Sequence, residues 1–232
     1  SDPRVRAGAL RALRQIPAHS EATLQRVRRS ASDAQADVRT QAVLAFAASS
    51  ARSSDEFVRV VVAALQDPEE EVRAAGVTGL MKLGAGAAAV VPTLAQMLGS
   101  DDASLRRSAA VTLAALGPVS RPALPALIAA LQQASDEEII VFAISRIGGS
   151  AVPHLLEAAV QTSASPALAR ALGAIGPAAT GPLLEALADE GEATRTTAAR
   201  ALGNLENPTV HVAEQLGTRL NDDSPAVREA VA

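Results

Sequence analysis

The first residues to test for chemistry are the three histidines, because imidazole is a common metal ligand and proton carrier. His19, His154 and His211 lie far apart, and none belongs to an H-E-x-x-H motif. Cysteine is absent, which excludes disulfides, thiolate nucleophiles and cysteine-based metal sites. These residues therefore predict no catalytic residue, no metal and no cofactor.

Acidic residues gather in three short clusters, Asp101-Asp102, Asp136-Glu137-Glu138 and Asp222-Asp223. Each has too few ligands for a Ca²⁺ site. Each also lies where a helix is expected to begin, and carboxylates there cap the first turn. The segment Gly84-Ala85-Gly86 follows an expected helix and not a strand, so it is no phosphate-binding loop.

Charge is distributed unevenly along the chain, although the net charge of −4 gives no overall attraction to nucleic acid or anionic membrane. Residues 1–60 hold ten arginines and six acids, whereas residues 61–232 hold eleven Lys and Arg and nineteen acids. The basic amino-terminal part, which includes Arg26, Arg28 and Arg29, is either a contact patch or an ordinary solvated surface.

The elements that position these residues come from an internal repeat. An arginine with an aliphatic or aromatic residue seven positions later marks most units, at Arg6, Arg39, Arg73, Arg106, Arg195 and, as a restart, Arg228. Two further units end at Gly148 and Gly176, with Glu137 and Ser165 at the marker positions. A period of 28 to 34 residues is typical of a solenoid.

Each unit is predicted to form two helices. In the third unit, Asp67 is expected to cap the first helix, Pro68 to occupy its first position and Gly84 to end it in the left-handed conformation. The second helix follows Pro92 or opens with it. Its apolar stripe is Val91, Leu94 and Leu98.

The pattern D-x4-V-R-x2-A-x3-L-x2-L-G, followed by V-P-x-L-x3-L, resembles HEAT repeats over essentially the whole chain. It is most similar to the short HEAT-like repeats named after phycobilisome lyases. The resemblance implies an all-α, right-handed α-solenoid of about seven helical hairpins and the start of an eighth. As a single domain, its units are 1–33, 34–67, 68–101, 102–133, 134–161, 162–189, 190–222 and 223–232. The interrupted last unit indicates a segment of a longer protein.

The resemblance also implies a ladder of acid–arginine pairs between neighbouring units. Its expected members are Asp33, Arg39, Asp67, Arg73, Asp101, Arg106, Asp189, Arg195, Asp222 and Arg228. Units five and six lack it, because Glu137 and Ser165 replace arginine and Leu131 and Ala159 stand at the acid positions. We expect changed curvature or softer packing around residues 134–176, either as a functional feature or as drift of the repeat.

Two enzymatic relatives with this type of fold do not match the residues present. Deoxyhypusine hydroxylase resembles the chain in fold but requires His-Glu motifs for iron, and these are absent. DNA glycosylases with HEAT-like repeats use aromatic side chains and a basic groove. The chain has no Trp or Tyr and a negative body, so nucleic acid is an unfavourable partner.

The surface expected to carry function is the concave side, which second helices usually line in such folds. Aligning these helices on Leu94 predicts a basic amino-terminal part followed by small, weakly polar residues. The candidate partner-binding residues are Arg26, Arg29, Thr93, Gln96, Met97, His154 and Glu157. His154 and Glu157, one turn apart, form either a pH-sensitive or partner-contacting pair or a solvated surface pair.

The sequence therefore predicts a non-catalytic scaffold that binds a protein partner, or a neighbouring domain of its own chain, along the concave face. Two alternatives stay open: a lyase-like subunit that handles a chromophore or other ligand, and nucleic-acid contact through the basic amino-terminal repeats. Self-association is a further possibility, because the last helix, 224–232, lacks its mate. No apolar run is long enough to span a membrane, and the sequence indicates no compartment.

Overall fold

The computed structural model describes residues 2–16, 20–49, 55–133, 137–162 and 165–232. Within these ranges every regular element is a helix, which confirms the predicted all-α class. The contacts between residues divide the chain into two compact units, Ser1–Thr112 and Leu113–Ala232.

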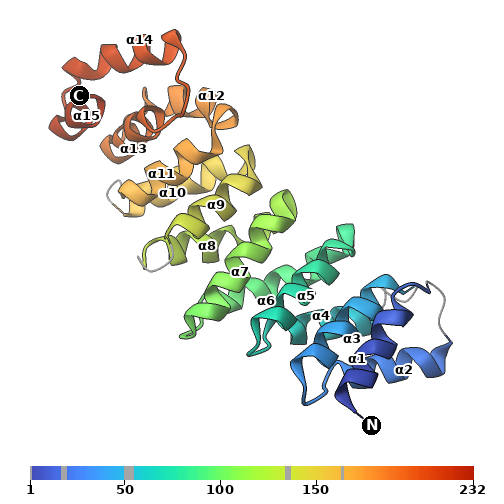
Figure 1. Ribbon diagram of the computed structural model, residues 1–232. Coiled ribbons are helices and arrows are strands. Elements are labelled where there is room, and N and C mark those ends of the chain that lie inside the picture. The colour runs from blue at the N-terminus through green and yellow to red at the C-terminus, as the bar shows by residue number, and fades with distance from the viewer. Residues whose placement is uncertain (1, 17–19, 50–54, 134–136, 163–164) are drawn as a thin grey trace. The chain divides into compact units, whose positions relative to one another are not determined.

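Helices of the amino-terminal unit follow one another in pairs, coloured blue to green in Figure 1. A 3-10 helix connects the members of the third pair. The elements are α1 (Pro3–Leu13), α2 (Glu21–Ser30), α3 (Ala36–Ala48), α4 (Asp55–Leu65), α5 (Glu70–Met81), η2 (Gly84–Val90) and α6 (Val91–Met97), followed by α7 (Ala103–Leu116), which continues across the boundary.

The carboxyl-terminal unit repeats the same arrangement, with short 3-10 helices at three of its connections. Its last helix has no following mate in the chain as given. The elements are η3 (Gly117–Ala123), α8 (Leu124–Leu131), α9 (Glu137–Ile147), η4 (Gly149–Ala151), α10 (Val152–Gln161), α11 (Pro166–Ile175), α12 (Pro177–Ala186), α13 (Glu192–Gly203), α14 (Val210–Thr218), η5 (Arg219–Asn221) and α15 (Pro225–Val231).

Proline sets where most second helices begin. Pro92, Pro125 and Pro153 occupy the first turn of α6, α8 and α10, where a missing N–H removes no helical hydrogen bond. Pro182 differs, because it lies inside α12.

The predicted ends of the third unit's first helix need correction. Helix α5 begins at Glu70, and Asp67 instead accepts a hydrogen bond of 3.0 Å from the Glu69 N–H in the turn before it. Gly84 opens the 3-10 helix η2. Left-handed glycines end first helices in the other unit, at Gly117 (φ +56°), Gly148 (+81°) and Gly176 (+72°).

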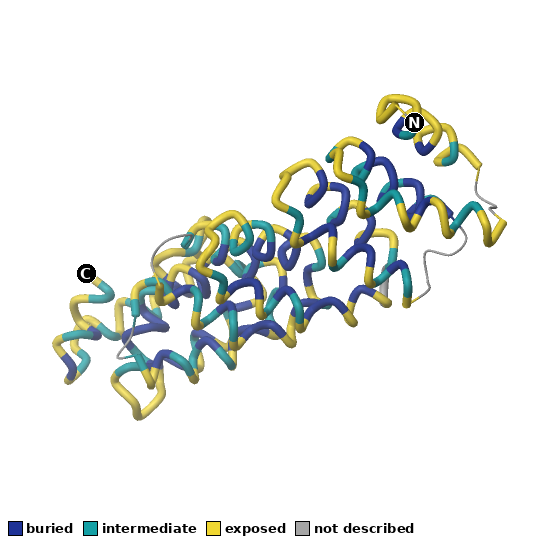
Figure 2. Tube along the Cα trace, turned by 90° about the horizontal axis from the view of Figure 1, so that it is seen from below, coloured by how far each residue is buried: buried dark blue, intermediate teal, exposed yellow. Residues whose placement is uncertain are grey.

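The core is built mainly from alanine, valine and leucine. Figure 2 shows in dark blue where the buried residues lie along the helices. Small residues let neighbouring helices approach closely. A Cβ at Gly76 would lie 3.2 Å from the Ala64 Cβ of α4. Two of the three phenylalanines, Phe46 and Phe57, pack together with ring centroids 5.3 Å apart.

One helical stretch of the described residues, 103–131, is long and apolar enough to be considered as a membrane span. It consists of three elements, α7, η3 and α8, and the backbone turns at Gly117. Its leucines Leu124, Leu127 and Leu131 are buried against the protein itself. Packing in the repeat core therefore accounts for part of its apolar character.

Candidate functional site

Among the described residues, bidentate arginine–aspartate pairs, which we call rungs, connect consecutive repeats at three places. The guanidinium of Arg6 donates from Nε and Nη2 to both carboxylate oxygens of Asp33, at 2.8 Å each. Arg39 binds Asp67 in the same two-pronged way, also at 2.8 Å, and Arg195 binds Asp222 at 3.1 and 3.0 Å. This geometry fits the planar guanidinium and gives a strong hydrogen-bonded pair.

Arg39 and Arg195 also bind the loop before their own helices. Arg39 Nη1 donates to the carbonyl oxygens of Asp33 and Ala34, at 2.9 and 3.1 Å. Arg73, Arg106, Arg195 and Arg228 donate in the same way to the carbonyls five and six residues before them. One arginine side chain therefore binds the loop of its own repeat. Where it also has an aspartate partner, it binds the next repeat as well.

The hydrogen bonds hold the acids of the rungs in the ionised form. Arg6, and then the N–H of Gln35, lower the pKa of Asp33. Arg195 and the Ser224 N–H act in the same way to lower the pKa of Asp222. For Asp67 burial opposes ionisation, but Arg39 and the Glu69 N–H outweigh it and the pKa is lowered.

The rung between the third and fourth repeats differs from the expected one. Ser100, and not Asp101, stands six residues before Arg106, and its Oγ accepts the Asp102 N–H at 3.2 Å as the aspartates do elsewhere. Asp101 contributes its backbone carbonyl to Arg106. Within the described residues Arg73 has no carboxylate at ion-pair distance, although it is buried.

Helix starts correct the alignment of the fifth and sixth repeats. The fourth residue is arginine in α1, α3, α5, α7, α13 and α15, but Ile140 in α9 and Ala169 in α11. Helices α9 and α11 have 11 and 10 residues, whereas α7 has 14. Aligning the repeats on the glycine after each helix therefore assigned the marker position to Glu137 and Ser165. Leu131 and Ala159, placed at the acid positions, are buried core residues.

A reversed ion pair exists where the ladder was expected to be missing. Glu137, the first residue of α9, pairs with the guanidinium of Arg170 in α11, so here the acid comes from the earlier repeat. The pair is more exposed than the Arg39–Asp67 rung. The expected change of curvature or packing over 134–176 stays a prediction.

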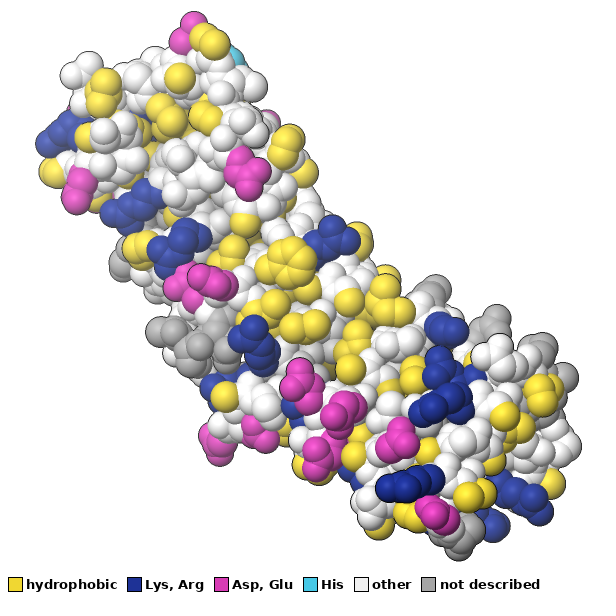
Figure 3. All heavy atoms as spheres, in the orientation of Figure 1, with side chains coloured by type: hydrophobic (Ala, Val, Ile, Leu, Met, Phe, Trp, Pro, Cys, Tyr) yellow, Lys and Arg dark blue, Asp and Glu magenta, His cyan; other side chains and the backbone are white. Residues whose placement is uncertain are grey.

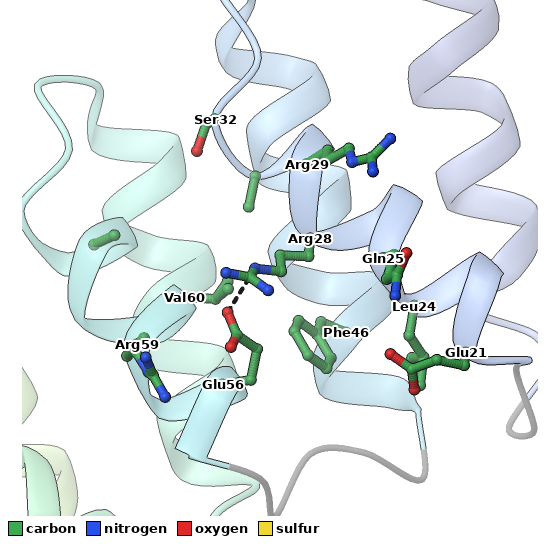
Figure 4. A pocket seen from close by; sticks show the side chains of 12 residues that line it. Glu21, Leu24, Gln25, Arg28, Arg29, Ser32, Phe46, Glu56, Arg59 and Val60 are labelled. Carbon is green, nitrogen blue, oxygen red and sulfur yellow. Dashed lines mark ion pairs between the residues drawn. The ribbon is translucent and has the colours of Figure 1, made fainter.

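A groove of about 880 Å³ lies between the second helices of the first two repeats, α2 and α4. Arg28, Arg29 and Arg59 line it together with Glu21 and Glu56. Leu24, Phe46 and Val60 supply its apolar part. Figure 4 shows Arg28 of α2 directed at Glu56 of α4, and their Nε and Oε1 atoms are 2.6 Å apart.

The local sequence explains where these charges lie. Arg28 and Arg29 are in the last turn of α2, where the helix dipole favours cations, and Glu56 is in the first turn of α4, where it favours anions. Ser20 accepts the Thr23 N–H at 3.3 Å and so starts α2. Figure 3 shows Lys and Arg side chains gathered over the visible face of the amino-terminal unit.

The predicted partner-binding residues of this unit divide into two groups. Arg29 lines the α2/α4 groove, and Arg26 is exposed on the same helix but is not part of the groove lining. Gln96 is exposed and Thr93 is partly exposed on α6. Met97 is only 5% exposed and belongs to the core, so it does not offer a surface for a partner.

The predicted pair of the carboxyl-terminal unit is not joined. His154 is half-buried, with its Nδ1 atom covered and without a hydrogen-bond partner, and no contact links it to Glu157. Glu157 lines a shallower groove of about 450 Å³ between α10 and α12. Glu185 and Asp189 line that groove too, and Leu156 and Val160 are among its apolar residues.

Other positions in the described parts of the chain offer less for recognition. A pocket of about 760 Å³ near the ends of α11 and α13 contains one cation, Arg170, and Glu137 already neutralises it. His211 and Glu214 are 4.0 Å apart on the exposed face of α14. In the described residues no three His, Asp or Glu side chains gather as a metal site; His19 lies outside them.

Sequence reasoning missed Glu56, Arg59 and Phe46 as parts of the groove, and it assigned Arg28 only to a nucleic-acid alternative. Aligning the second helices on Leu94 places Val60, and not its neighbour Arg59, at the position of Arg26 and Thr93. Val60 is buried, so the exposed position is its neighbour. Shifting the alignment of α4 by one residue would have placed Arg59 at the exposed position.

Comparison with known proteins agrees with this geometry. The family model described as HEAT repeats matches residues 27–114, 58–144 and 152–232, which together make up most of the chain. The chain belongs to the HEAT-repeat family. The paired helices and the arginine–aspartate rungs are thus features of a HEAT-repeat α-solenoid, which confirms the predicted fold class. No curated protein matches the sequence significantly.

Several solved HEAT-repeat structures are similar to this chain. Kap95p in its complex with RanGDP is 15% identical over 97% of this chain and 37% of that chain, with a TM-score of 0.59. Yeast importin-β (Kap95p) is 14% identical over 99% and 38%, with a TM-score of 0.51. The CpcE–CpcF phycocyanin lyase complex of Nostoc sp. PCC7120 is 21% identical over 91% and 93%, with a TM-score of 0.44. The chain spans little more than a third of the Kap95p chains.

Proposed function

We propose that this HEAT-repeat segment is a non-catalytic scaffold whose α2/α4 groove binds an acidic segment of a protein partner. One observation carries the proposal. Arg28, Arg29 and Arg59, from two consecutive second helices, line one groove beside the apolar side chains of Leu24 and Ala63. A peptide with closely spaced carboxylates and aliphatic side chains matches both kinds of surface.

The charges of the groove residues support this choice of ligand. Arg29 and Arg59 have no carboxylate at ion-pair distance among the described residues, so two cations are available to a ligand. Arginine binds carboxylates through a planar fork of donors. Arg26, exposed on α2, would extend the basic surface, and Thr93 and Gln96 of α6 remain predicted contacts further along the second helices.

A protein segment fits the groove better than a nucleic acid does. Single-stranded nucleic acids are usually held by exposed aromatic rings, on which bases stack. The one ring at the groove, Phe46, is 3% exposed. Kap95p, a similar fold by its structure, binds the protein RanGDP according to its structural description, and this similarity supports only the general role.

The test is fluorescence anisotropy with two labelled peptides, one of alternating Glu and Leu (the acidic probe) and one of alternating Lys and Leu. We expect wild-type protein to bind the acidic probe more tightly than the basic one. Replacing Arg28, Arg29 and Arg59 together by Glu should weaken binding of the acidic probe on the order of thirtyfold or more, because attraction becomes repulsion.

The matched control is the triple variant Arg4→Glu/Arg11→Glu/Arg107→Glu. It makes the same change of charge in the same unit, at exposed residues outside the groove. Equal loss of binding in both variants would show non-specific electrostatic attraction and contradict the proposal. Stronger binding of a labelled oligothymidylate than of the acidic probe would contradict the proposal and identify the groove as a nucleic-acid-binding site.

A further inference from the structure

The ion pair between Arg28 and Glu56 crosses the α2/α4 groove and uses one of its three lining arginines. The Nε to Oε1 distance is 2.6 Å, and the side chains are 56% and 30% exposed. Figure 4 shows that Arg29 points away from this pair, while Arg59 comes from α4 itself. Of the three arginines that line the groove, Arg28 is therefore the one paired with a carboxylate among the described residues.

We infer that Glu56 is an internal competitor: it occupies on Arg28 the position that a carboxylate of the acidic segment takes when the partner binds. This inference rests on the proposed function. The incoming carboxylate and Glu56 have the same chemical group, and a guanidinium offers the same fork of donors to either.

Displacement of Glu56 is physically inexpensive. The pair is partly exposed, so the released carboxylate regains water, and exposed ion pairs contribute little net stability. Glu56 also lies in the first turn of α4, where the helix dipole continues to favour its negative charge after Arg28 has turned to the ligand.

A ligand with several acids close together is the kind that can displace Glu56 from Arg28. A single carboxylate can bind Arg29 or Arg59 without opposition, whereas binding to Arg28 requires displacement of Glu56. A segment with clustered acids has a high effective concentration of its second and third carboxylate at Arg28 once the first is bound. Glu56 thus lowers the affinity for segments that also bind Arg28, and it does not oppose the binding of a single carboxylate to Arg29 or Arg59.

The experiment compares Glu56→Gln with Glu21→Gln, using the acidic probe. Both substitutions remove one negative charge from the lining of the same groove, but only Glu56 holds an arginine. We expect Glu56→Gln to tighten binding about two- to fivefold relative to Glu21→Gln, the range of an exposed ion pair. In an Arg28→Gln background the two substitutions should have equal effects.

Each result has a definite meaning. If wild-type protein fails to bind the acidic probe, the proposed function fails and this inference fails with it. If wild-type protein binds and Glu56→Gln equals Glu21→Gln, the inference alone is overturned. A Glu56→Ala variant, checked for wild-type thermal unfolding, repeats the test without the polar amide and must tighten binding to the same degree.

Discussion

The two grooves between second helices carry opposite charge. Three arginines and two glutamates line the α2/α4 groove of the amino-terminal unit. Three acids, Glu157, Glu185 and Asp189, line the α10/α12 groove of the carboxyl-terminal unit, and no Lys or Arg accompanies them among its described lining residues. Both grooves have aliphatic side chains between the charges.

The contrast shows which residues specify the fold and which are free to specify a partner. The buried faces of both units are built from the same alanine, valine and leucine side chains, so packing does not depend on the groove charges. The connections between repeats differ less than the groove charges do. Among the described residues, two bidentate rungs occur in the first unit, and one reversed pair and one bidentate rung occur in the second. Recognition can therefore change along a HEAT-repeat chain while its architecture stays the same.

The largest effect is expected at a rung of the amino-terminal unit. Asp67→Ala removes both hydrogen bonds to Arg39 and the one to the Glu69 N–H, and leaves a largely buried guanidinium without its carboxylate. We expect the free energy of unfolding to fall by about 2–3 kcal/mol. Urea denaturation measures it.

Asp101→Ala is the matched control for that rung. Asp101 also precedes a repeat, but it is exposed and only its backbone carbonyl binds Arg106. Its loss should change the free energy of unfolding by less than about 0.5 kcal/mol. Similar losses of unfolding free energy in Asp67→Ala and Asp101→Ala would show that the pair between Asp67 and Arg39 adds no stability of its own.

A second comparison uses one substitution in a first helix of each unit. Gly173→Ala in α11 would put a Cβ 2.7 Å from the Asn204 Cβ and 3.1 Å from the Ala201 carbonyl oxygen. We expect a loss of about 1–2 kcal/mol from overpacking. Gly8→Ala in α1 meets nothing within 4 Å and should gain up to about 1 kcal/mol. Thermal unfolding of both variants checks the opposite signs.

Acid is expected to weaken the rungs in a defined direction. The pKa values of Asp33, Asp67 and Asp222 are lowered in the folded protein, so the folded state favours the ionised carboxylates. Their stabilisation is complete well above the ordinary aspartate pKa of about 3.9 and is lost as the pH falls through it towards the folded pKa. Urea midpoints measured from pH 6 to pH 3 should fall less steeply in Asp33→Asn than in wild-type protein, and parallel curves would oppose this assignment.

The smallest effect is expected at the reversed pair. Glu137→Gln breaks the ion pair with Arg170, but the side chains are 29% and 51% exposed and remain solvated. The free energy of unfolding should fall by less than about 1 kcal/mol. A loss as large as that of Asp67→Ala would mean that the reversed pair is equivalent to a full rung.

Much of the architecture was predictable because a repeated period constrains it. Arg39, Arg73 and Arg106 recur with aliphatic or aromatic residues at fixed offsets, and these predicted the helical pairs and the α-solenoid class that the HEAT-repeat match confirms. Details within one repeat were less predictable. Because the fifth and sixth repeats were aligned on Gly148 and Gly176, the shorter lengths of α9 and α11 were not recognised.

The groove was only partly predictable, because it depends on where side chains of two different helices point. Arg29 was identified from its column, but Glu56 and Arg59 face the groove through the rotation of α4, which spacing alone does not determine. Met97 illustrates the opposite error: a position next to the polar column is turned into the core.

The central claim is that the α2/α4 groove, and not its acidic counterpart, receives an acidic segment. Hydrogen–deuterium exchange of the whole chain with and without the acidic probe tests it most directly. The account predicts slower amide exchange in α2 and α4 on binding and unchanged exchange in α10 and α12. Slower exchange in α10 and α12, or no change in α2 and α4 at saturating probe, would contradict it.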